Sequence, residues 1–335
     1  MESDSSASNL SPFYLNNYYS KISHLTFKTI FIPLSPEEQN VILSFQKAKY
    51  QKTHIFKSEE AILLHQLENK IDQALIDFNS PTGVYVKLNF RSPKDGFPLR
   101  NDLIPQIFNE EFNKLNEKWD RKLWKLPITE EDYVGNLKWI SLYRTLEILA
   151  CCKNSKEILN LLLSSVRIEE DLQYILKVKE QGYLVLREFN PEINGLYEFR
   201  CFIKDNELKS ITQYNHPWLV QELLNEEFCE EVKEKILKYW LENVKKTIEY
   251  LKDYVMDLAL IGKGELLLIE LNPIDTSGTG LFKGSEAISS HSLVFKVRNN
   301  LEIPYKEHWE DYLQYMMVDF CAHKPYTEFL ESQEK

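Results

Sequence analysis

The chain has 335 residues, of which 43% are hydrophobic and 27% charged, and this composition is typical of a folded protein with a sizeable core. Its net charge of −11 disfavours a general nucleic-acid surface or anionic-membrane surface, so we expect neither partner. No apolar run is long enough to span a bilayer, and the N-terminus lacks a signal-peptide pattern. Five cysteines without a CxxC spacing predict free thiols in a reducing compartment. We expect a cytoplasmic monomer.

Glycine-rich phosphate loops are absent from the sequence. Neither GxxxxGK[S/T] nor GxGxxG occurs among its 10 glycines. A nucleotide site, if the protein has one, must therefore use another design.

In chain order, the first expected elements are a strand in FKTIFIPL and a helix capped by Ser35. A longer amphipathic helix follows Ser58, and VYVKLNF (84–90) alternates as a strand should before the turn RSPKDG. Residues 100–180 are expected to be mainly helical. The core stripe predicted for the second helix consists of Leu64, Leu67, Ile71, Leu75 and Phe78.

The second half has a clearer strand signal. We expect a strand at 182–189, a hairpin with its turn at Asp205-Asn206, and a helix over 226–253. A second hairpin is predicted in VMDLALIGKGELLLIEL, across Gly262-Lys263-Gly264. The fold class is therefore predicted to be α+β, with antiparallel sheets flanked by helices.

The expected organisation is two lobes with a short lead-in and a tail. Residues 1–12 are a predicted disordered lead-in, 13–180 an N-terminal lobe, 181–300 a C-terminal lobe and 301–335 a helical tail. The aromatic residues of the tail, Trp309, Tyr312 and Tyr315, fit either an interface anchor or, more commonly, a core stripe.

Three polar side chains stand out at the end of the second hairpin. If Ile261 pairs with Gly264, Asp257 lies opposite Leu268 and shares a face with Glu270 and Asn272. Two carboxylates and an amide are hard oxygen ligands suited to Mg²⁺. A three-residue loop would instead move Asp257 to the other face. The alternative reading is that these residues are polar strand ends in solvent.

Two strand cations complement this acidic set. Lys87 lies inside VYVKLNF, where its ammonium fits a phosphate, and Asn89 shares its face as a further candidate. Arg200 lies in EFRCF, and its planar fork can bind phosphate oxygens with two hydrogen bonds. Each signal alone is also compatible with a solvated strand face. Together they match the needs of Mg·ATP without a phosphate loop.

Four segments of the sequence, taken together, resemble those of a known family. The segments VYVKLNFRSPKDG, YLVLREF, GLYEFRCFIKDNELKSITQY and VMDLALIGKGELLLIELNP are similar, in this order, to the cell division cycle protein 123 family. The similarity runs from FKTIFIPL to the LF of TGLF and is strongest in EFRCF and LNP. It implies an ATP-grasp fold with the nucleotide between two lobes. It also implies a role in assembling eukaryotic translation initiation factor 2 through its gamma subunit.

The resemblance also implies site residues. Lys87 corresponds to a phosphate-contacting lysine, the 92–95 turn to the family's S-A-P-[RK]-D with the alanine missing, and 186–188 to the segment at the base. Magnesium ligands would be Asp257, Glu270 (where aspartate is usual) and Asn272. The expected ATP contacts outside the metal ligands are Lys87, Asn89, Ser92, Pro93, Lys94, Asp95, Leu186, Arg187, Glu188 and Arg200.

Departures from the family pattern leave other functions open. Phe90 replaces a tryptophan, Ile211–Tyr214 replaces S-Q-R-D, and 274–276 replaces F-G-E. Besides an assembly chaperone, the sequence is compatible with an ATP-grasp ligase or transferase, with Glu198, Asp95 and Asp275 as candidate bases. A third alternative is a divergent copy that has lost nucleotide binding. If the source is an intracellular bacterium, the protein would act in a host cytosol.

Overall fold

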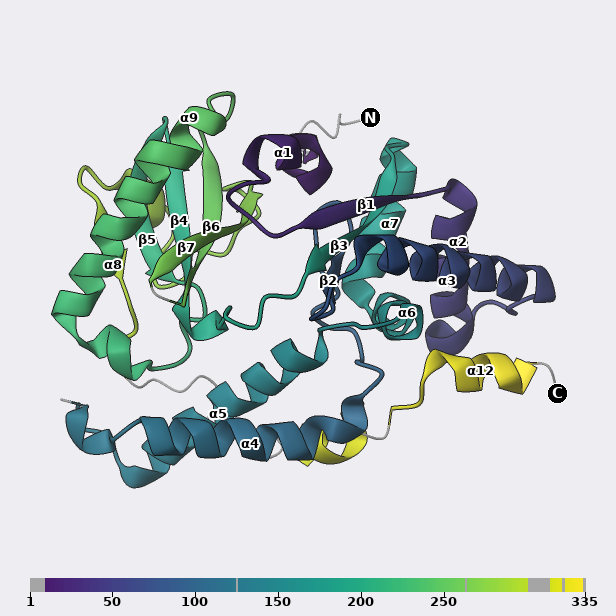
Figure 1. The fold of residues 1–335 in the computed structure, drawn as a ribbon, viewed down its shortest axis with the longest axis horizontal. Coiled ribbons are helices and arrows are strands. Elements are labelled where there is room, and N and C mark those ends of the chain that lie inside the picture. Colours follow the sequence, from purple (N-terminus) through teal and green to yellow (C-terminus); the bar gives the residue numbers. More distant parts are fainter. Residues whose placement is uncertain (1–9, 125, 263, 301–313, 321–322, 334–335) are drawn as a thin grey trace. The chain divides into compact units, whose positions relative to one another are not determined.

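The computed structural model describes residues 10–300 without 125 and 263, together with 314–320 and 323–333 (Figure 1). The chain forms two compact units, each built from segments far apart in the sequence. One unit comprises Met1–Phe27, Glu111–Arg144 and Asn190–Lys306, and the other Lys28–Glu110, Thr145–Phe189 and Glu307–Lys335. We call them the 257 unit and the 87 unit, after Asp257 and Lys87. The predicted lobes are contiguous stretches, and their boundaries stay a prediction.

The 87 unit is built on a three-stranded antiparallel sheet in the order β1-β3-β2. Its strands are β1 Thr29–Leu34, β2 Val84–Lys87 and β3 Gly182–Glu188. Pairing of Val84 with Glu188 and of Val86 with Leu186 places the even-numbered residues of all three strands on one face. That face joins a single apolar cluster with helices α2 Pro36–Gln46, α3 Ser58–Phe78, α6 Ser155–Ser164 and α7 Val166–Val178.

Local sequence accounts for the start of α2. Ser35 Oγ accepts from Glu38 N at 3.2 Å, and Glu38 Oε2 accepts from Ser35 N at 2.7 Å, so the two residues form a capping box. On α3, the predicted stripe is confirmed: Leu64, Leu67, Ile71 and Phe78 are buried, and Leu75 packs partly buried beside them.

The C-terminal segment packs on the 87 unit. It forms a π-helical turn at Met316–Phe320 and helix α12 at Tyr326–Gln333. Tyr326 is 2% exposed and belongs to the same apolar cluster, next to the ring of Phe45. Trp309 and Tyr312 lie outside the described residues, and Tyr315 is exposed.

A five-stranded sheet, in the order β7-β6-β4-β5-β8, forms the centre of the 257 unit. The strands are β4 Glu198–Lys204, β5 Glu207–Gln213, β6 Tyr254–Ile261, β7 Glu265–Asn272 and β8 Val294–Lys296, antiparallel except for the parallel pair β5/β8. Helix α8 Glu226–Tyr239 runs across one face (Figure 1), followed by the π-helical turn Trp240–Val244 and α9 Lys245–Thr247. Trp240 Nε1 donates to Tyr254 Oη at 3.0 Å from that side.

The remaining helices are α1, α4, α5 and α10, together with several short helical turns. Helix α1 Leu15–Ile22 and the residues after it flank the edge strand β7, where Leu268 N donates to Leu25 O. Helices α4 Ile104–Lys118 and α5 Glu130–Leu149 have residues in both units, and α10 Glu286–Ser289 packs on β4 and β5. Short 3₁₀ helices occur at Ser11–Phe13, Asn101–Leu103, Arg121–Leu123, Gly195–Tyr197 and Gln221–Leu224, and a π-helical turn at Lys47–Gln51.

The α+β prediction is confirmed, and three details of it are wrong. Strand β2 ends at Lys87 instead of continuing to Phe90, because Leu88 N turns to bond Arg91 O at 2.8 Å. The helix from Glu226 ends at Thr247, so Leu251 is not part of it. In the second hairpin, Ile261 pairs with Glu265 and not with Gly264. Among the described helices, none has the length and apolar character that a bilayer crossing requires.

Candidate functional site

A cluster of polar side chains lies on the face of the five-stranded sheet opposite to Tyr254. Arg200 on β4 is directly opposite Asp257 on β6, and Asp257 is opposite Glu270 on β7. Asn272, two residues after Glu270, points to the same side. We call these four residues the Arg200 cluster. The structure thus brings together the predicted metal ligands of the chain, together with the predicted arginine.

The shared face arises from a different register than the one predicted. The loop has three residues, and Leu258 pairs with Leu268. One additional residue, Ile269, then forms a β-bulge, and the pairing resumes with Asp257 opposite Glu270. The bulge therefore cancels the face change that the three-residue loop would otherwise cause.

Arg200 and Asp257 form a two-pronged ion pair. Nε and Nη2 of Arg200 donate to Oδ1 and Oδ2 of Asp257 at 2.9 and 2.8 Å, while Nη1 donates to Gly278 O at 3.1 Å. Asp257 is 1% exposed, so this pair is nearly removed from water. Burial acts to lower the pKa of Arg200, but the charge of Asp257 and its hydrogen bonds outweigh burial and raise that pKa.

The donor set fits magnesium in its chemistry. Asn272 Nδ2 lies 3.0 Å from Asp257 Oδ2 and 3.3 Å from Glu270 Oε1, so three oxygen-bearing side chains converge on one point. To coordinate a metal beside the carboxylates, Asn272 would turn its amide oxygen toward them. In the described part of the chain, no group of three or more His, Cys, Asp and Glu side chains could hold a metal ion. A magnesium site here would therefore need the amide and phosphate oxygens as ligands.

Apolar residues flank the Arg200 cluster at both ends along the strands. Phe202 and Val255 pack with Phe282 and Ala287 at one end, and Ala259 packs with Phe27 and Ile193 at the other. Such surroundings reduce the local dielectric and strengthen charge interactions within the cluster.

The segment after β7 approaches the cluster closely. Gly278 O accepts from Arg200, and Leu281 N donates to Thr212 Oγ1 at 3.3 Å. Gly280 adopts φ +61°, and a Cβ at this position would lie 2.5 Å from Thr212 Cγ2. Only glycine therefore fits this approach without a shift of the segment.

In the 87 unit, two buried cations share a sheet face. Lys87 pairs with Val185 and Tyr85 with Arg187, so the side chains of Lys87 and Arg187 lie on the face away from the apolar cluster. Both residues are 5% exposed. Leu186 is buried in the apolar cluster of the opposite face, and Glu188 points to that face also. Of the predicted 186–188 segment, Arg187 alone shares the face of Lys87.

Asn89 and Asp95 serve local structure. The Asn89 amide donates to Gln181 O at 2.8 Å and accepts from Tyr183 N at 2.6 Å, which joins the end of β2 to the start of β3. Asp95 accepts from Ser165 Oγ at 2.5 Å and from Arg167 N at 3.2 Å, so it caps the first turn of α7. A nucleotide role for either residue stays a prediction.

The rest of the predicted turn is held by α7 as well. Ser92 O accepts from Arg167 Nε at 3.1 Å, and Gly96 N donates to Pro93 O at 3.0 Å. Lys94 is exposed. These hydrogen bonds hold the backbone of the turn, and Lys94 lies at the surface.

Sequence reasoning missed Tyr214 as a neighbour of Arg200. The Arg200 guanidinium lies 4.7 Å from the centre of the Tyr214 ring, and Tyr214 N donates to Glu198 O at 2.8 Å. A signal was available in the sequence, because Tyr214 follows the hairpin partner of Arg200, Thr212, by two residues and so shares its face.

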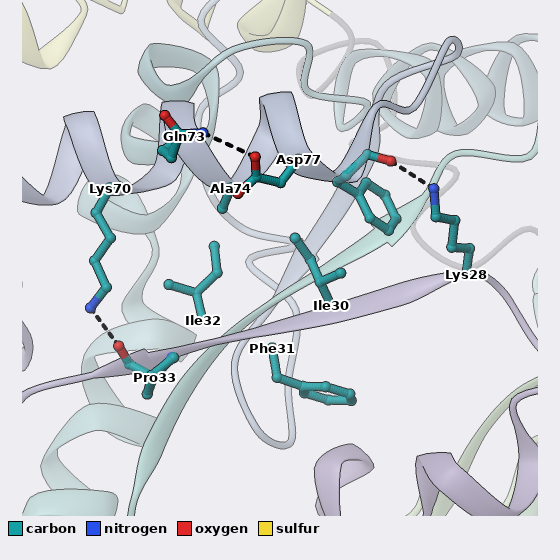
Figure 2. A pocket seen from close by; sticks show the side chains of 10 residues that line it. Lys28, Ile30, Phe31, Ile32, Pro33, Lys70, Gln73, Ala74 and Asp77 are labelled. Carbon is teal, nitrogen blue, oxygen red and sulfur yellow. Dashed lines mark hydrogen bonds between the residues drawn. The ribbon is translucent and has the colours of Figure 1, made fainter.

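A separate groove of about 530 Å³ lies between β1 and α3 (Figure 2). Lys28 and Lys70 reach into it, and Lys28 Nζ donates to Phe78 O while Lys70 Nζ donates to Pro33 O. Its apolar lining comes from Ile30, Phe31, Ile32, Ala74 and Phe78. None of the predicted site residues lines this groove, so it is distinct from the candidate nucleotide site.

The fold is an α+β fold of the ATP-grasp-like type, and it is similar to that of solved structures. The structure of Cdc123 from Schizosaccharomyces pombe matches with a TM-score of 0.53 at 20% identity, over 86% of this chain and 96% of that one. A C-terminally truncated form of the same protein matches with a TM-score of 0.52. At this identity the likeness establishes the fold alone.

Sequence comparison establishes the family. The model of the D123 family matches residues 136–306, which are 171 of 335 residues and thus just over half of the chain. The chain belongs to the D123 family, the cell division cycle protein 123 family.

Curated relatives match part of their length. A protein named translation initiation factor eIF2 assembly protein in Danio rerio is 30% identical over 164 residues, covering 46% of this chain and 45% of the relative. Proteins of the same name in Dictyostelium discoideum and Candida albicans are 26% and 28% identical, covering 52% and 51% of this chain and 47% and 46% of theirs. The chain spans about half the length of the curated relatives that it matches.

Proposed function

We propose that this protein binds Mg·ATP and assists the assembly of eukaryotic translation initiation factor 2, as the names of its relatives describe for them. The observation that carries the proposal is the Arg200 cluster. This chain belongs to the family, and its Arg200 cluster places an arginine, two carboxylates and an amide on one sheet face. These groups suit a metal-bound triphosphate.

Each side chain has a defined part in the proposal. Asp257, Glu270 and Asn272 would hold Mg²⁺, which when bound neutralises and orients the phosphates. Arg200 would bind phosphate oxygens through its fork, and Lys87 would contact phosphate as a point charge. Arg187 shares the face of Lys87 and would add a second cation there.

The proposed partner is the gamma subunit of initiation factor 2, and the proposed location is the cytoplasm. The names of the relatives support initiation factor 2 as the partner, and the choice of its gamma subunit rests on the family resemblance alone. The acidic balance of the chain, −11 overall, favours a partner with a basic surface.

A second candidate function is an ATP-grasp ligase or transferase. One observation favours it: Glu198 lies two residues before Arg200 on β4 and therefore on the same face, where a base for an acceptor group would be needed. Asp95 is a poor candidate because it caps α7. Asp275 is exposed and makes the weaker alternative.

The testing experiment is a calorimetric titration with ATP, with and without Mg²⁺, followed by mass spectrometry of the same mixture. Magnesium-dependent binding with intact ATP and unmodified protein supports the assembly factor. Formation of ADP or AMP, or a mass increase of the protein, supports the ligase. Absence of binding refutes both nucleotide functions.

A matched pair of variants localises the site. Glu270→Gln removes a predicted metal ligand, and Glu265→Gln makes the same change at the exposed start of the same strand. We expect at least tenfold weaker Mg·ATP binding for the first variant and unchanged binding for the second.

The proposed partner is tested separately. The purified gamma subunit is tested for co-sedimentation with the wild-type protein in the presence of Mg·ATP.

A further inference from the structure

Both carboxylate oxygens of Asp257 accept hydrogen bonds from Arg200. A magnesium ion bound to these oxygens at about 2.1 Å would stand close to the guanidinium, and two positive groups at this distance repel strongly in a poorly solvated site. Conversely, Arg200 cannot turn its fork to a phosphate while both prongs remain on Asp257. The ion pair therefore competes with each of the two roles proposed above.

Other contacts hold Arg200 in the paired position. Its Nη1 donates to Gly278 O, and its guanidinium lies 4.7 Å from the centre of the Tyr214 ring. A cation at this distance over an aromatic ring is stabilised, and most strongly where water has little access. The Arg200 side chain is only 13% exposed, so its cation–π contact with Tyr214 is stronger than such a contact at an exposed position.

The hydrogen bonds of Asn272 also compete with metal binding. Its Nδ2 donates to Asp257 Oδ2 and to Glu270 Oε1, which leaves the carboxylates bridged by an N–H₂ group instead of an oxygen ligand. Metal coordination would require this amide to turn. The four residues thus satisfy one another, and a metal ion must replace several of these contacts at once.

We propose that Mg²⁺ and the triphosphate bind the Arg200 cluster cooperatively, because opening the Arg200–Asp257 pair serves both, and that Tyr214 is the positioning residue that holds Arg200 on Asp257. When one ligand binds alone, its affinity is reduced by the full free energy needed to open the Arg200–Asp257 pair. When both ligands bind, the pair opens only once, because Arg200 then binds the phosphate and Asp257 binds the metal. By linkage, each ligand then raises the affinity of the other by the same factor. The inference rests on the proposed nucleotide site.

The test measures metal binding without nucleotide, with Mn²⁺ as the probe and the signal of free Mn²⁺ in electron paramagnetic resonance as the readout. Arg200→Met removes the cation from Asp257, and we expect it to bind Mn²⁺ at least tenfold more tightly than the wild type does. The double variant Arg200→Met/Glu270→Gln should lose this gain, which places the ion at the cluster. Equal or weaker Mn²⁺ binding by Arg200→Met overturns the proposal.

Tyr214 supplies a second test that leaves the buried charge pair in place. Tyr214→Leu should tighten Mn²⁺ binding about twofold to tenfold, because the pair opens more readily without the ring. Tyr214→Phe keeps the ring and should bind as the wild type does. A role in structure alone would not produce a gain in metal affinity, so unchanged binding by Tyr214→Leu overturns the assignment of Tyr214.

The nucleotide titration separates this inference from the proposed function. In the wild type, ATP with Mg²⁺ should bind at least fivefold more tightly than ATP with a chelator. If Mg·ATP does not bind at all, the proposed function fails, whereas a gain in Mn²⁺ affinity for Arg200→Met still supports the competition of Arg200 with a metal. Equal ATP affinity with and without Mg²⁺ contradicts the cooperativity.

Discussion

Asp257 and Glu270 face each other across β6 and β7 because Ile269 forms a bulge between them and the loop. In an uninterrupted register, the pairing of Ile261 with Glu265 would place Asp257 opposite Ile269 and turn Glu270 to the other face. The candidate metal ligands thus depend on a single irregular residue. Bulges commonly redirect side chains at functional sites, and this hairpin fits that use.

Lys87→Met tests the phosphate role of the buried strand lysine. We expect the Kd for ATP to rise at least tenfold, since a charged hydrogen bond contributes about 1.5–3 kcal/mol. Adenosine carries no phosphate, so its affinity should stay within twofold. Competition binding with both ligands measures the difference. Lys70→Met, a lysine of the same unit in the β1/α3 groove, is the control and should leave both affinities unchanged. Equal losses for ATP and adenosine would contradict the phosphate role.

Gly280→Ala tests the close approach of the segment after β7. The alanine would have to adopt φ +61° and its Cβ would meet Thr212 Cγ2, so we expect a loss of about 2–3 kcal/mol in the free energy of unfolding. Gly284→Ala is the matched control, because φ is +53° there but no atom lies within 4 Å of the new Cβ. Its loss should be about 1 kcal/mol, from backbone strain alone. Urea unfolding measures both, and equal losses would refute the steric part.

Thr212→Ser provides a rescue of the same contact. The substitution removes the methyl group that Gly280→Ala would strike and keeps the hydroxyl that accepts from Leu281 N. The double variant should therefore recover part of the stability lost in Gly280→Ala. Strictly additive losses would mean that the methyl group is not the obstacle.

Stability at mildly acidic pH should depend on His323. Its ring stacks on Phe97 with centroids 3.6 Å apart, and burial, with a smaller contribution from the charge of Lys49, lowers its pKa to about 4. The unfolded chain takes up the proton near pH 6.5 but the folded chain does not, so stability is full above pH 6.5 and falls as the pH drops toward 4. The loss should be about 1–2 kcal/mol, because the ring is only half-buried.

A comparison of variants isolates this titration. His323→Phe keeps an aromatic ring on Phe97 and removes the proton site, so its stability in urea should change less between pH 7 and pH 4.5. Burial also lowers the pKa of the nearby Lys49, to about 8, but that group titrates only above this pH and leaves the acidic range unaffected. An equal pH dependence of wild type and variant would show that His323 is not the titrating group.

Ser35→Ala tests the capping box of α2. The variant loses the acceptor for Glu38 N, and we expect a loss of about 1 kcal/mol in unfolding free energy. Ser58→Ala is the control, because Ser58 is the first helical residue of α3 and the cap position is Lys57. It should change stability by less than about 0.5 kcal/mol. Thermal or urea unfolding distinguishes the two, and a similar loss in both would argue against the cap.

Local sequence signals predicted most elements of this fold. Asp205 and Asn206 form the expected tight turn with φ of +54° and +58°, a conformation that these residue types tolerate. The spacing of apolar residues located α3, and alternation located β3, β4 and β5. These signals act over a few residues, so they are readable without knowledge of the tertiary structure.

The roles of some residues depend on contacts between segments far apart in the chain, and these contacts could not be predicted from local sequence. Asn89 resembled a strand residue, but its amide bonds residues 181 and 183, more than 90 positions away. Asp95 resembled part of a surface turn, but it caps a helix that begins 71 residues later. The bulge at Ile269 has no local signature in ELLLIEL. Asp257, Glu270 and Asn272 nevertheless share one sheet face, as predicted, because the three-residue loop and the bulge shift the register in compensating ways.

The chain passes back and forth between its two compact units, and this limits which fragments of it can fold alone. The described chain changes unit at 27/28, 110/111, 144/145 and 189/190, so neither unit corresponds to one continuous gene segment. The family-matched stretch 136–306 includes β3 but neither β1 nor β2, its two sheet neighbours. Produced alone, that stretch would expose both edges of an apolar strand, and such edges promote aggregation. A single proteolytic cut of the chain would therefore release neither unit intact, because each unit is built from several separate segments.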